Sequence, residues 1–311
     1  MLYISHSQAL SLCILLTLCN HVINAYKYNP NPNPINNLCP ITNDTNIVYS
    51  MVNGVGPASI RWVQDYLWWW KSYDNTINYM GLTAIDFQNC NFADYINLRI
   101  YVNPGGDAYD QLEALTSTGT SNIINFITRN QTNPSAYVGF CAGTYIASHD
   151  YIWETLYEGV DYYKYKENPP MSLFPHMVEG SIVDIGDDEF GDKVGYKHRL
   201  VNVSNGHQML YYGGSTFGYN GALDYTDKSS GLGVYDEDIE VVVYYSDFYG
   251  FNSVNIPAAW RYKHNMFLTS VHPEADNCTH WEASPNVAND CPPPGTIPTD
   301  VILQNRAWLA T

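Results

Sequence analysis

Basic residues are scarce in this chain. Lysine and arginine together number 14 in 311 residues, against 31 aspartates and glutamates, so the formal net charge is −17. Nucleic acids and anionic membrane surfaces attract proteins that present a basic face. The composition therefore excludes nucleic acid as a partner, and it argues against binding to a membrane surface.

The usual cofactor and metal motifs are also missing. The sequence has no phosphate-binding Gly-x-x-x-x-Gly-Lys loop and no convincing Gly-x-Gly-x-x-Gly fingerprint. His272-Pro273-Glu274 has the His-x-Glu form of zinc deaminases, but Cys291 lies in no Pro-Cys-x-x-Cys motif. The acidic run from Asp184 to Asp192 lacks the spacing of a calcium-binding loop and is better explained as a solvated turn. We expect no cofactor and no metal.

The N-terminal apolar run, from Ala9 to Cys19, is too short to span a bilayer comfortably. It is followed by a small residue, Ala25, so residues 1–25 are predicted to be a secretory signal peptide; a buried N-terminal helix is the alternative. Asn-Pro repeats disfavour helix and central strand, so residues 26–45 are predicted to be an extended tether. We expect a secreted protein, or one in an endomembrane lumen such as a lysosome-like compartment.

The cysteine count agrees with export. Of seven cysteines, Cys13 and Cys19 lie in the predicted signal, and the odd number that remains points to one free thiol. If Cys141 is that thiol, four cysteines can pair in three ways. Proximity in the sequence favours Cys278–Cys291, which leaves Cys39–Cys90 to pin the tether to the domain.

Four Asn-x-Ser/Thr sequences are compatible with glycosylation of an exported protein. Their asparagines are Asn43, Asn130, Asn202 and Asn277.

The first half of the chain alternates between strand and helix patterns, which is typical of a parallel α/β sheet. Strands are expected at residues 46–51, 79–87, 98–102 and 136–140, with helices at 58–73 and 112–128. The second half is richer in strands, which are expected at residues 181–185, 198–203, 208–212, 240–245 and 265–271. We predict one catalytic domain over residues 46–275 and a C-terminal tail over 276–311.

Gly139-Phe140-Cys141-Ala142-Gly143 follows the strand pattern of residues 136–140. A cysteine between two glycines at a strand-to-helix turn is how a fold exposes a nucleophile, because the glycines permit a turn that would crowd any Cβ. The helix N-terminus that follows favours the thiolate. The segment therefore predicts a nucleophilic Cys141 with Gly139 and Gly143 forming its elbow.

The other pieces of a thiol-dependent active site are present in the sequence. His272, at the end of the last apolar strand, is the candidate base, and Glu274 can accept from its second ring nitrogen. The backbone N–H groups of Gly106, in Pro104-Gly105-Gly106-Asp107, and of Ala142 are candidates for an oxyanion hole.

These segments resemble a known family. The elbow resembles that of the biotin-protein ligase N-terminal domain, in the class I glutamine amidotransferase-like superfamily. Pro104–Asp107, Tyr211–Gly214 and Val271–Glu274 resemble its Pro-Gly-Gly-Ala-Asp, Tyr-Tyr-Asn-Gly-Gly and Val-His-Pro-Glu segments. The resemblance covers residues 46–274 and implies a flavodoxin-like three-layer α/β sandwich, mostly parallel with antiparallel additions. It also implies a Cys-His-Glu triad carried onto Cys141, His272 and Glu274.

Two departures limit what the resemblance implies. Thr144 stands where the family often has a second glycine, and no basic glycine-rich adenylate loop is present. We therefore expect neither ligase nor synthase activity. Instead, we expect a hydrolase of small-molecule or peptide amides that is similar to γ-glutamyl hydrolases. The alternative is a catalytically silent module that binds a ligand or partner. The sequence does not give the oligomeric state.

Overall fold

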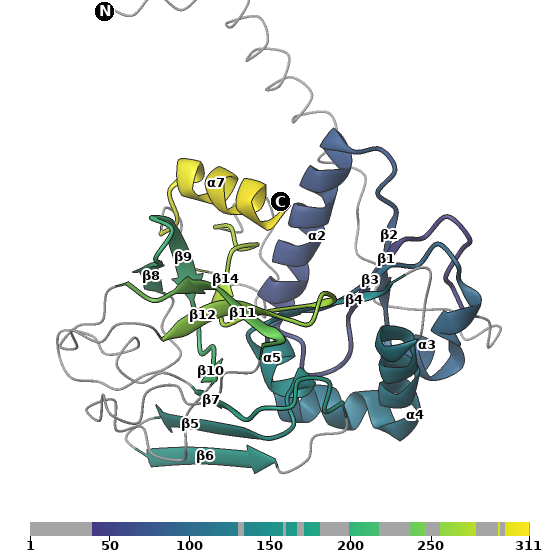
Figure 1. The fold of residues 1–311 in the computed structure, drawn as a ribbon, viewed down its shortest axis with the longest axis horizontal. Coiled ribbons are helices and arrows are strands. Elements are labelled where there is room, and N and C mark those ends of the chain that lie inside the picture. Colours follow the sequence, from purple (N-terminus) through teal and green to yellow (C-terminus); the bar gives the residue numbers. More distant parts are fainter. Residues whose placement is uncertain are drawn as a thin grey trace, which may run out of the picture. The chain divides into compact units, whose positions relative to one another are not determined.

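A seven-stranded sheet lies at the centre of the described part of the chain (Figure 1). The computed structural model describes residues 39–129, 134–157, 160–166, 171–180, 199–217, 237–246, 256–277, 292 and 296–310, which fall in one compact unit. The strand order is β11-β12-β13-β4-β3-β1-β2. Their bounds are β1 Ile47–Ser50, β2 Tyr79–Leu82, β3 Ile100–Asn103, β4 Ala136–Phe140, β11 Ile239–Tyr244, β12 Pro257–Tyr262 and β13 Met266–Thr269.

Parallel pairing joins β2, β1, β3, β4 and β13. The pairs β13–β12 and β12–β11 are antiparallel. This is the mostly parallel sheet with antiparallel additions that the sequence predicts.

Helices cover both faces of the sheet (Figure 1). Ile47 and Tyr49 pack in a cluster with Val63 and Leu67 of one helix, whereas Val48 packs on the opposite side with Leu112 of another. This alternation is what a strand buried on both faces requires. The helices are α2 Pro57–Tyr73, α3 Ala84–Asn89, η1 Phe92–Asp94, α4 Ala108–Thr128, α5 Ala142–Ala147 and α7 Thr299–Leu309. The architecture is the three-layer α/β sandwich that was expected.

The described residues also form two smaller sheets. One has the order β10-β7-β5-β6, and the other β14-β9-β8. Their bounds are β5 Tyr151–Tyr157, β6 Val160–Lys166, β7 Val178–Gly180, β8 Arg199–Asn202, β9 Gln208–Tyr211, β10 Thr216–Phe217 and β14 Val271–His272.

The strand expected over residues 79–87 is half wrong. The strand ends at Leu82, and Thr83 then caps α3, because its N–H donates to Asp86 Oδ2 (2.8 Å) and its hydroxyl accepts from the Asp86 N–H (3.4 Å). A reciprocal pair of this kind begins a helix. The helix expected from residue 112 begins earlier, at Ala108, because the Asp107 side chain caps it. The strand expected at 181–185 lies outside the described residues.

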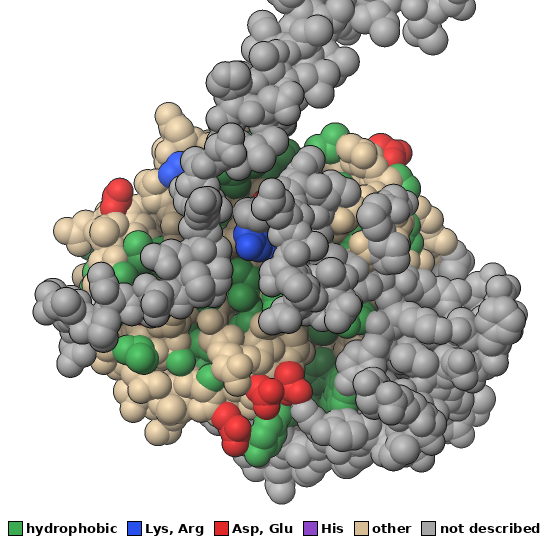
Figure 2. Space-filling view, turned by 180° about the vertical axis from the view of Figure 1, so that it is seen from behind, with side chains coloured by type: hydrophobic (Ala, Val, Ile, Leu, Met, Phe, Trp, Pro, Cys, Tyr) green, Lys and Arg blue, Asp and Glu red, His purple; other side chains and the backbone are tan. Residues whose placement is uncertain are grey.

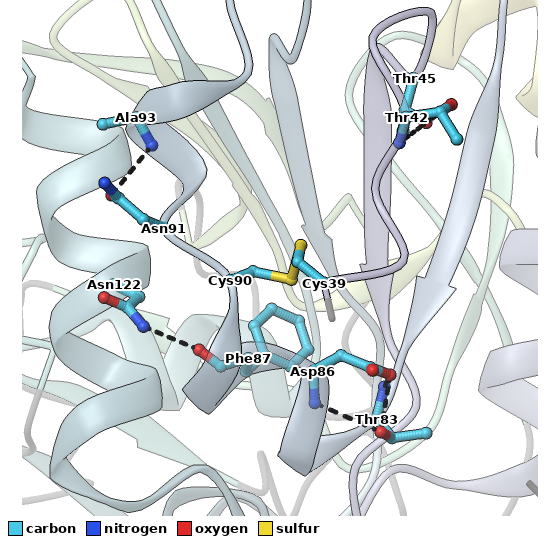
Figure 3. Close-up of a disulfide and its surroundings, with 10 residues drawn as sticks. All are labelled: Cys39, Thr42, Thr45, Thr83, Asp86, Phe87, Cys90, Asn91, Ala93 and Asn122. Carbon is cyan, nitrogen blue, oxygen red and sulfur yellow. Dashed lines mark hydrogen bonds between the residues drawn. A yellow bond between two sulfur atoms is a disulfide. The ribbon is translucent and has the colours of Figure 1, made fainter. Parts of the chain in front are cut away.

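The disulfide between Cys39 and Cys90 joins the segment before β1 to the end of α3 (Figure 3). It closes a loop of 51 residues and lies beside the buried Phe87. Ile41 is also in the core. Residues 39–41, which the sequence assigns to the tether, are therefore fastened to the domain. The predicted Cys278–Cys291 pair lies outside the described residues.

The predicted glycosylation sites differ in their surroundings. Asn43 and Asn202 are exposed. Asn277 is half-buried, and its side chain pairs with the Ile297 backbone, donating to the carbonyl (2.5 Å) and accepting from the N–H (2.8 Å). Asn130 lies outside the described residues. Use of these sites stays a prediction.

The surface of the described residues is poor in basic side chains. Figure 2 shows one face, on which acidic side chains gather beside hydrophobic ones while Lys and Arg are sparse. Within the described ranges, no helix has both the length and the apolar character needed to cross a membrane.

Replacing both cysteines of the observed disulfide, as Cys39→Ser with Cys90→Ser, should lower the free energy of unfolding by about 3 kcal/mol. The loss comes from the 51-residue loop that is no longer closed in the unfolded chain. Urea unfolding of the double variant measures it. Stability equal to that of the wild type would contradict a disulfide at this position.

Candidate active site

Cys141 lies at a strained turn between β4 and α5. Its backbone has φ 48° and ψ −102°, a conformation that costs a non-glycine residue about 1–3 kcal/mol. The Cys141 N–H donates to the Thr269 carbonyl (2.8 Å), and the Thr144 N–H and hydroxyl donate to the Cys141 carbonyl (2.9 and 2.6 Å). These bonds hold the residue in the conformation typical of a nucleophile elbow.

The two elbow glycines are required by close backbone approach. A Cβ at Gly139 would lie 2.8 Å from the Gly143 carbonyl oxygen, and a Cβ at Gly143 would lie 2.5 Å from that of Asn103. Both distances are below any real carbon–oxygen contact. The Gly-x-Cys-x-Gly spacing therefore lets α5 pack directly on β3 and β4.

The sulfur is less exposed than the sequence suggests. Cys141 is only 6% exposed, and it is the free cysteine among those described. Its thiol donates to the Tyr212 carbonyl, 3.3 Å from Sγ. The residue lines a cavity, so the thiol is reached from inside that cavity and does not project from the surface.

His272 and Glu274 form a buried pair next to Cys141. His272 Nδ1 lies 2.8 Å from Glu274 Oε1, and the two side chains are 1% and 0% exposed. The ring of Trp62 contacts the imidazole edge-on, with centroids 5.2 Å apart. The Trp62 indole is itself fixed, because Nε1 donates to the Asp276 carbonyl (3.1 Å). The imidazole orientation is thus set from two sides.

The surroundings of His272 favour its protonated form. Burial alone would lower the pKa of this ring, but the Glu274 carboxylate and the Cys141 sulfur outweigh burial and raise the pKa to about 10. At neutral pH the ring is therefore an imidazolium that lies between a carboxylate and the cysteine.

Gly105 lies next to both the His272 imidazole and Cys141. A Cβ at this position would lie 2.8 Å from His272 Cε1, 2.9 Å from Ser59 Oγ and 3.3 Å from Cys141 Cβ. The absence of a side chain at residue 105 is what allows His272 and Cys141 to approach each other.

The candidate oxyanion donors lie in two different segments. Gly106 has φ 140°, and a Cβ there would lie 2.2 Å from the Gly54 carbonyl oxygen. Hydrogen bonds from the Gly56 N–H to the Gly105 carbonyl (3.0 Å) and from the Asp107 N–H to the Gly54 carbonyl (2.7 Å) hold this loop. Within the described residues the N–H groups of Gly106 and Ala142 make no backbone hydrogen bond. Gly106 lines the cavity together with Cys141 and His272, whereas Ala142, the next residue after Cys141, does not.

The cavity has a volume of about 400 Å³, and aromatic side chains form part of its walls. The sequence alone does not predict these walls, since they come from α2, α4, α5, β5 and the segment after β9. They are Trp62, Tyr109, Tyr145, Tyr151, Trp153 and Tyr212. Three consecutive tryptophans of α2, Trp68, Trp69 and Trp70, do not line the cavity. Trp69 and Trp70 pack against the core around α2, and Trp68 is 48% exposed.

No group of His, Cys, Asp and Glu side chains able to hold a metal occurs in the described part of the chain. The acidic run at residues 184–192 lies outside it.

Gly105→Ala should lower the free energy of unfolding by about 1–3 kcal/mol, because the new methyl group meets His272 and Ser59 below 3 Å. Gly56→Ala is the matched control, since a Cβ there has only ordinary contacts of 3.6–3.7 Å. Urea unfolding should show the control within about 0.5 kcal/mol of the wild type. Equal effects of the two substitutions would argue against close packing at Gly105.

Glu274→Gln should return the His272 ring to its neutral form at pH 7. The substitution removes the main contribution that raises the pKa, and burial then lowers it below the ordinary value of about 6.5. In the wild type the ring should hold its proton until the pH approaches about 10. Its contribution to folding stability is then full below about pH 6.5 and is lost as the pH rises through the folded-state pKa.

Imidazole ¹⁵N chemical shifts, assigned with His272→Gln, measure this change directly. Glu113→Gln is the control, because Glu113 is exposed on α4 and does not line the cavity. A neutral ring in the wild type at pH 7 would contradict the account.

Comparison with known proteins places this site in a family context. The family model described as "Biotin-protein ligase, N terminal" matches residues 95–290. No curated protein matches the chain. Among solved structures, a glutamine amidotransferase is similar at 15% identity and TM-score 0.42, over 82% of this chain and 98% of its own. A ThuA-like protein from Bacteroides uniformis ATCC 8492 is similar at 10% identity and TM-score 0.40, over 89% of this chain and 94% of its own.

Proposed function

Since this chain belongs to the biotin-protein ligase N-terminal domain family, which matches residues 95–290, we propose that it is a thiol-dependent hydrolase of amide bonds. Cys141 is the nucleophile, His272 the acid–base residue and Glu274 its positioning partner. The observation that carries the proposal is the buried His272–Glu274 pair beside a cysteine held in an elbow conformation.

The first half-reaction forms a thioester. Cys141 Sγ reacts as the thiolate beside the His272 imidazolium: it attacks the amide carbon, and the carbonyl electrons move to oxygen. The N–H groups of Gly106, which lines the cavity, and of Ala142, which follows the nucleophile, are the candidate donors to that oxyanion, since neither makes a backbone bond among the described residues. His272 then donates its proton to the leaving nitrogen, and the carbon–nitrogen bond breaks.

The second half-reaction consumes water. His272 takes a proton from the water as the oxygen attacks the thioester carbon, and the sulfur leaves as the carboxylic acid is released. Glu274 keeps the imidazole in one orientation throughout, because its carboxylate holds Nδ1. No cofactor or metal takes part in this scheme, and neither ligation nor ammonia transfer is proposed.

One observation favours the alternative of a catalytically silent binding module. The Cys141 thiol donates to the Tyr212 carbonyl, so in this state its proton is directed away from His272. A binding module would keep the cavity and lose turnover. Activity measurements on the wild type and on Cys141→Ala separate the two functions.

We also propose that the protein works outside the reducing cytosol. The Cys39–Cys90 disulfide is compatible with a secreted or lumenal protein, since such bonds persist in oxidising compartments. An N-terminal sequence of the mature protein beginning at Tyr26 would support this location, and a retained Met1 with reduced cysteines would contradict it.

Cys141→Ala should lower kcat/KM by about 10³-fold or more, and His272→Ala should do the same. The double variant should lose no more than either single one, because residues of one catalytic unit act together. Hydrolysis of simple amide, γ-glutamyl and ester probes measures these effects. Unfolding curves should show that each variant is folded. If Cys141→Ala turns over every probe at the wild-type rate, the proposed function is wrong.

A further inference from the structure

In the described part of the chain, the acidic side chains that line the cavity are not balanced by lysine or arginine. Asp107 and Asp110 line it, and the described lining residues include no lysine or arginine. The imidazolium of His272 is already paired with Glu274. A ligand that brings a carboxylate into this space meets like charge, whereas one that brings a positive charge meets carboxylates.

The two aspartates have different roles in the fold. Asp107 caps α4, since its Oδ1 accepts from the N–H groups of Tyr109 (2.9 Å) and Asp110 (3.3 Å). Asp110, in the first turn of the helix, is not needed for that cap. It is half-buried against the loop opposite, because a Cβ at Gly54 would lie 2.7 Å from Asp110 Cβ. Its carboxylate is therefore available to a ligand at the edge of the cavity.

A buried hydroxyl on the cavity wall also lacks a partner. Tyr151 is 1% exposed, and its hydroxyl makes no hydrogen bond within the described residues. Burial, with smaller contributions from Asp107 and Tyr109, raises the pKa of this phenol, so Tyr151 lies near the acidic side of the cavity. An unpaired buried hydroxyl is costly unless a ligand or water satisfies it.

Aromatic faces complete the surroundings. Tyr109, Tyr151 and Trp153 line the same cavity as the two aspartates. Aromatic rings next to carboxylates are the usual surroundings of an organic cation, since ring faces and carboxylates both attract positive charge. An anionic ligand would gain from neither.

We propose that the cavity takes amides that carry a positively charged amine near the scissile bond, with Asp110, Tyr151 and Trp153 holding the cation. The amide half of this statement rests on the proposed function, but the cation site does not. Amides with a free carboxylate in that position are excluded by Asp107 and Asp110.

Three matched iodoacetamides test the cation site through Cys141. Each forms an S–C bond to Sγ and releases iodide, and they differ only in the N-substituent. The substituents are 2-(trimethylammonio)ethyl, its uncharged isostere 3,3-dimethylbutyl, and anionic 2-carboxyethyl. Mass spectrometry of the Cys141 peptide gives the rate constant for each reagent. We expect the cationic reagent to react at least tenfold faster than the neutral one, and the anionic reagent to be the slowest.

Asp110→Asn should reduce the preference for the cationic reagent to about threefold or less, and Glu113→Gln, on the exposed side of the same helix, should leave it unchanged. If Asp110→Asn fails to fold, the salt dependence of the wild type replaces it: the cationic-to-neutral ratio should fall as NaCl is raised. Equal rates, a preference for the anionic reagent, or no labelling by any of the three would overturn the inference.

This labelling is independent of turnover. If the protein prefers the cationic reagent but hydrolyses no amide probe, the proposed cation site stands and the proposed hydrolase function is wrong. If the protein hydrolyses amide probes but shows no preference for the cationic reagent, the hydrolase function stands and the cation site is wrong.

Discussion

The backbone conformation of Cys141 is the constraint on which the rest of the site depends. A non-glycine residue keeps φ 48° only where its surroundings leave no alternative. Here β4 lies between β3 and β13, the Thr269 carbonyl and Thr144 fix both peptide groups of Cys141, and glycines at 139 and 143 allow the close approach. The strain is local, and the whole central sheet supports it.

The same sheet brings the distant partner to the cysteine. Thr269, the last residue of β13, pairs with Phe140, the last residue of β4. The chain then leaves the central sheet and enters β14, where His272 pairs across to β9. Residues that are far apart in the sequence therefore meet because two parallel strands end at one edge, which is where α/β folds place ligands. The segment after β9 also supplies the Tyr212 carbonyl and part of the cavity.

Much of this arrangement could be predicted from the sequence, because it depends on patterns among residues that are close together in the chain. Residues 136–140 form a short apolar run that the glycine-flanked cysteine follows, and the strand occupies those five positions. The sequence does not distinguish the turn into α3 from a strand, although Thr83 and Asp86 carry a capping signal, because the apolar residues around them also fit a strand. The burial of Cys141 and the aromatic walls could not be predicted, because Trp62, Tyr151 and Tyr212 meet only through long-range packing.

The reactivity of Cys141 toward unsubstituted iodoacetamide tests the central claim most directly, that this cysteine is a nucleophile activated by His272. Labelling of the folded protein at pH 7, mapped by mass spectrometry, should modify Cys141 alone among the cysteines. Its rate should fall at least tenfold in a folded His272→Gln variant. An inert Cys141, or one that reacts equally fast without the imidazole, would contradict the account.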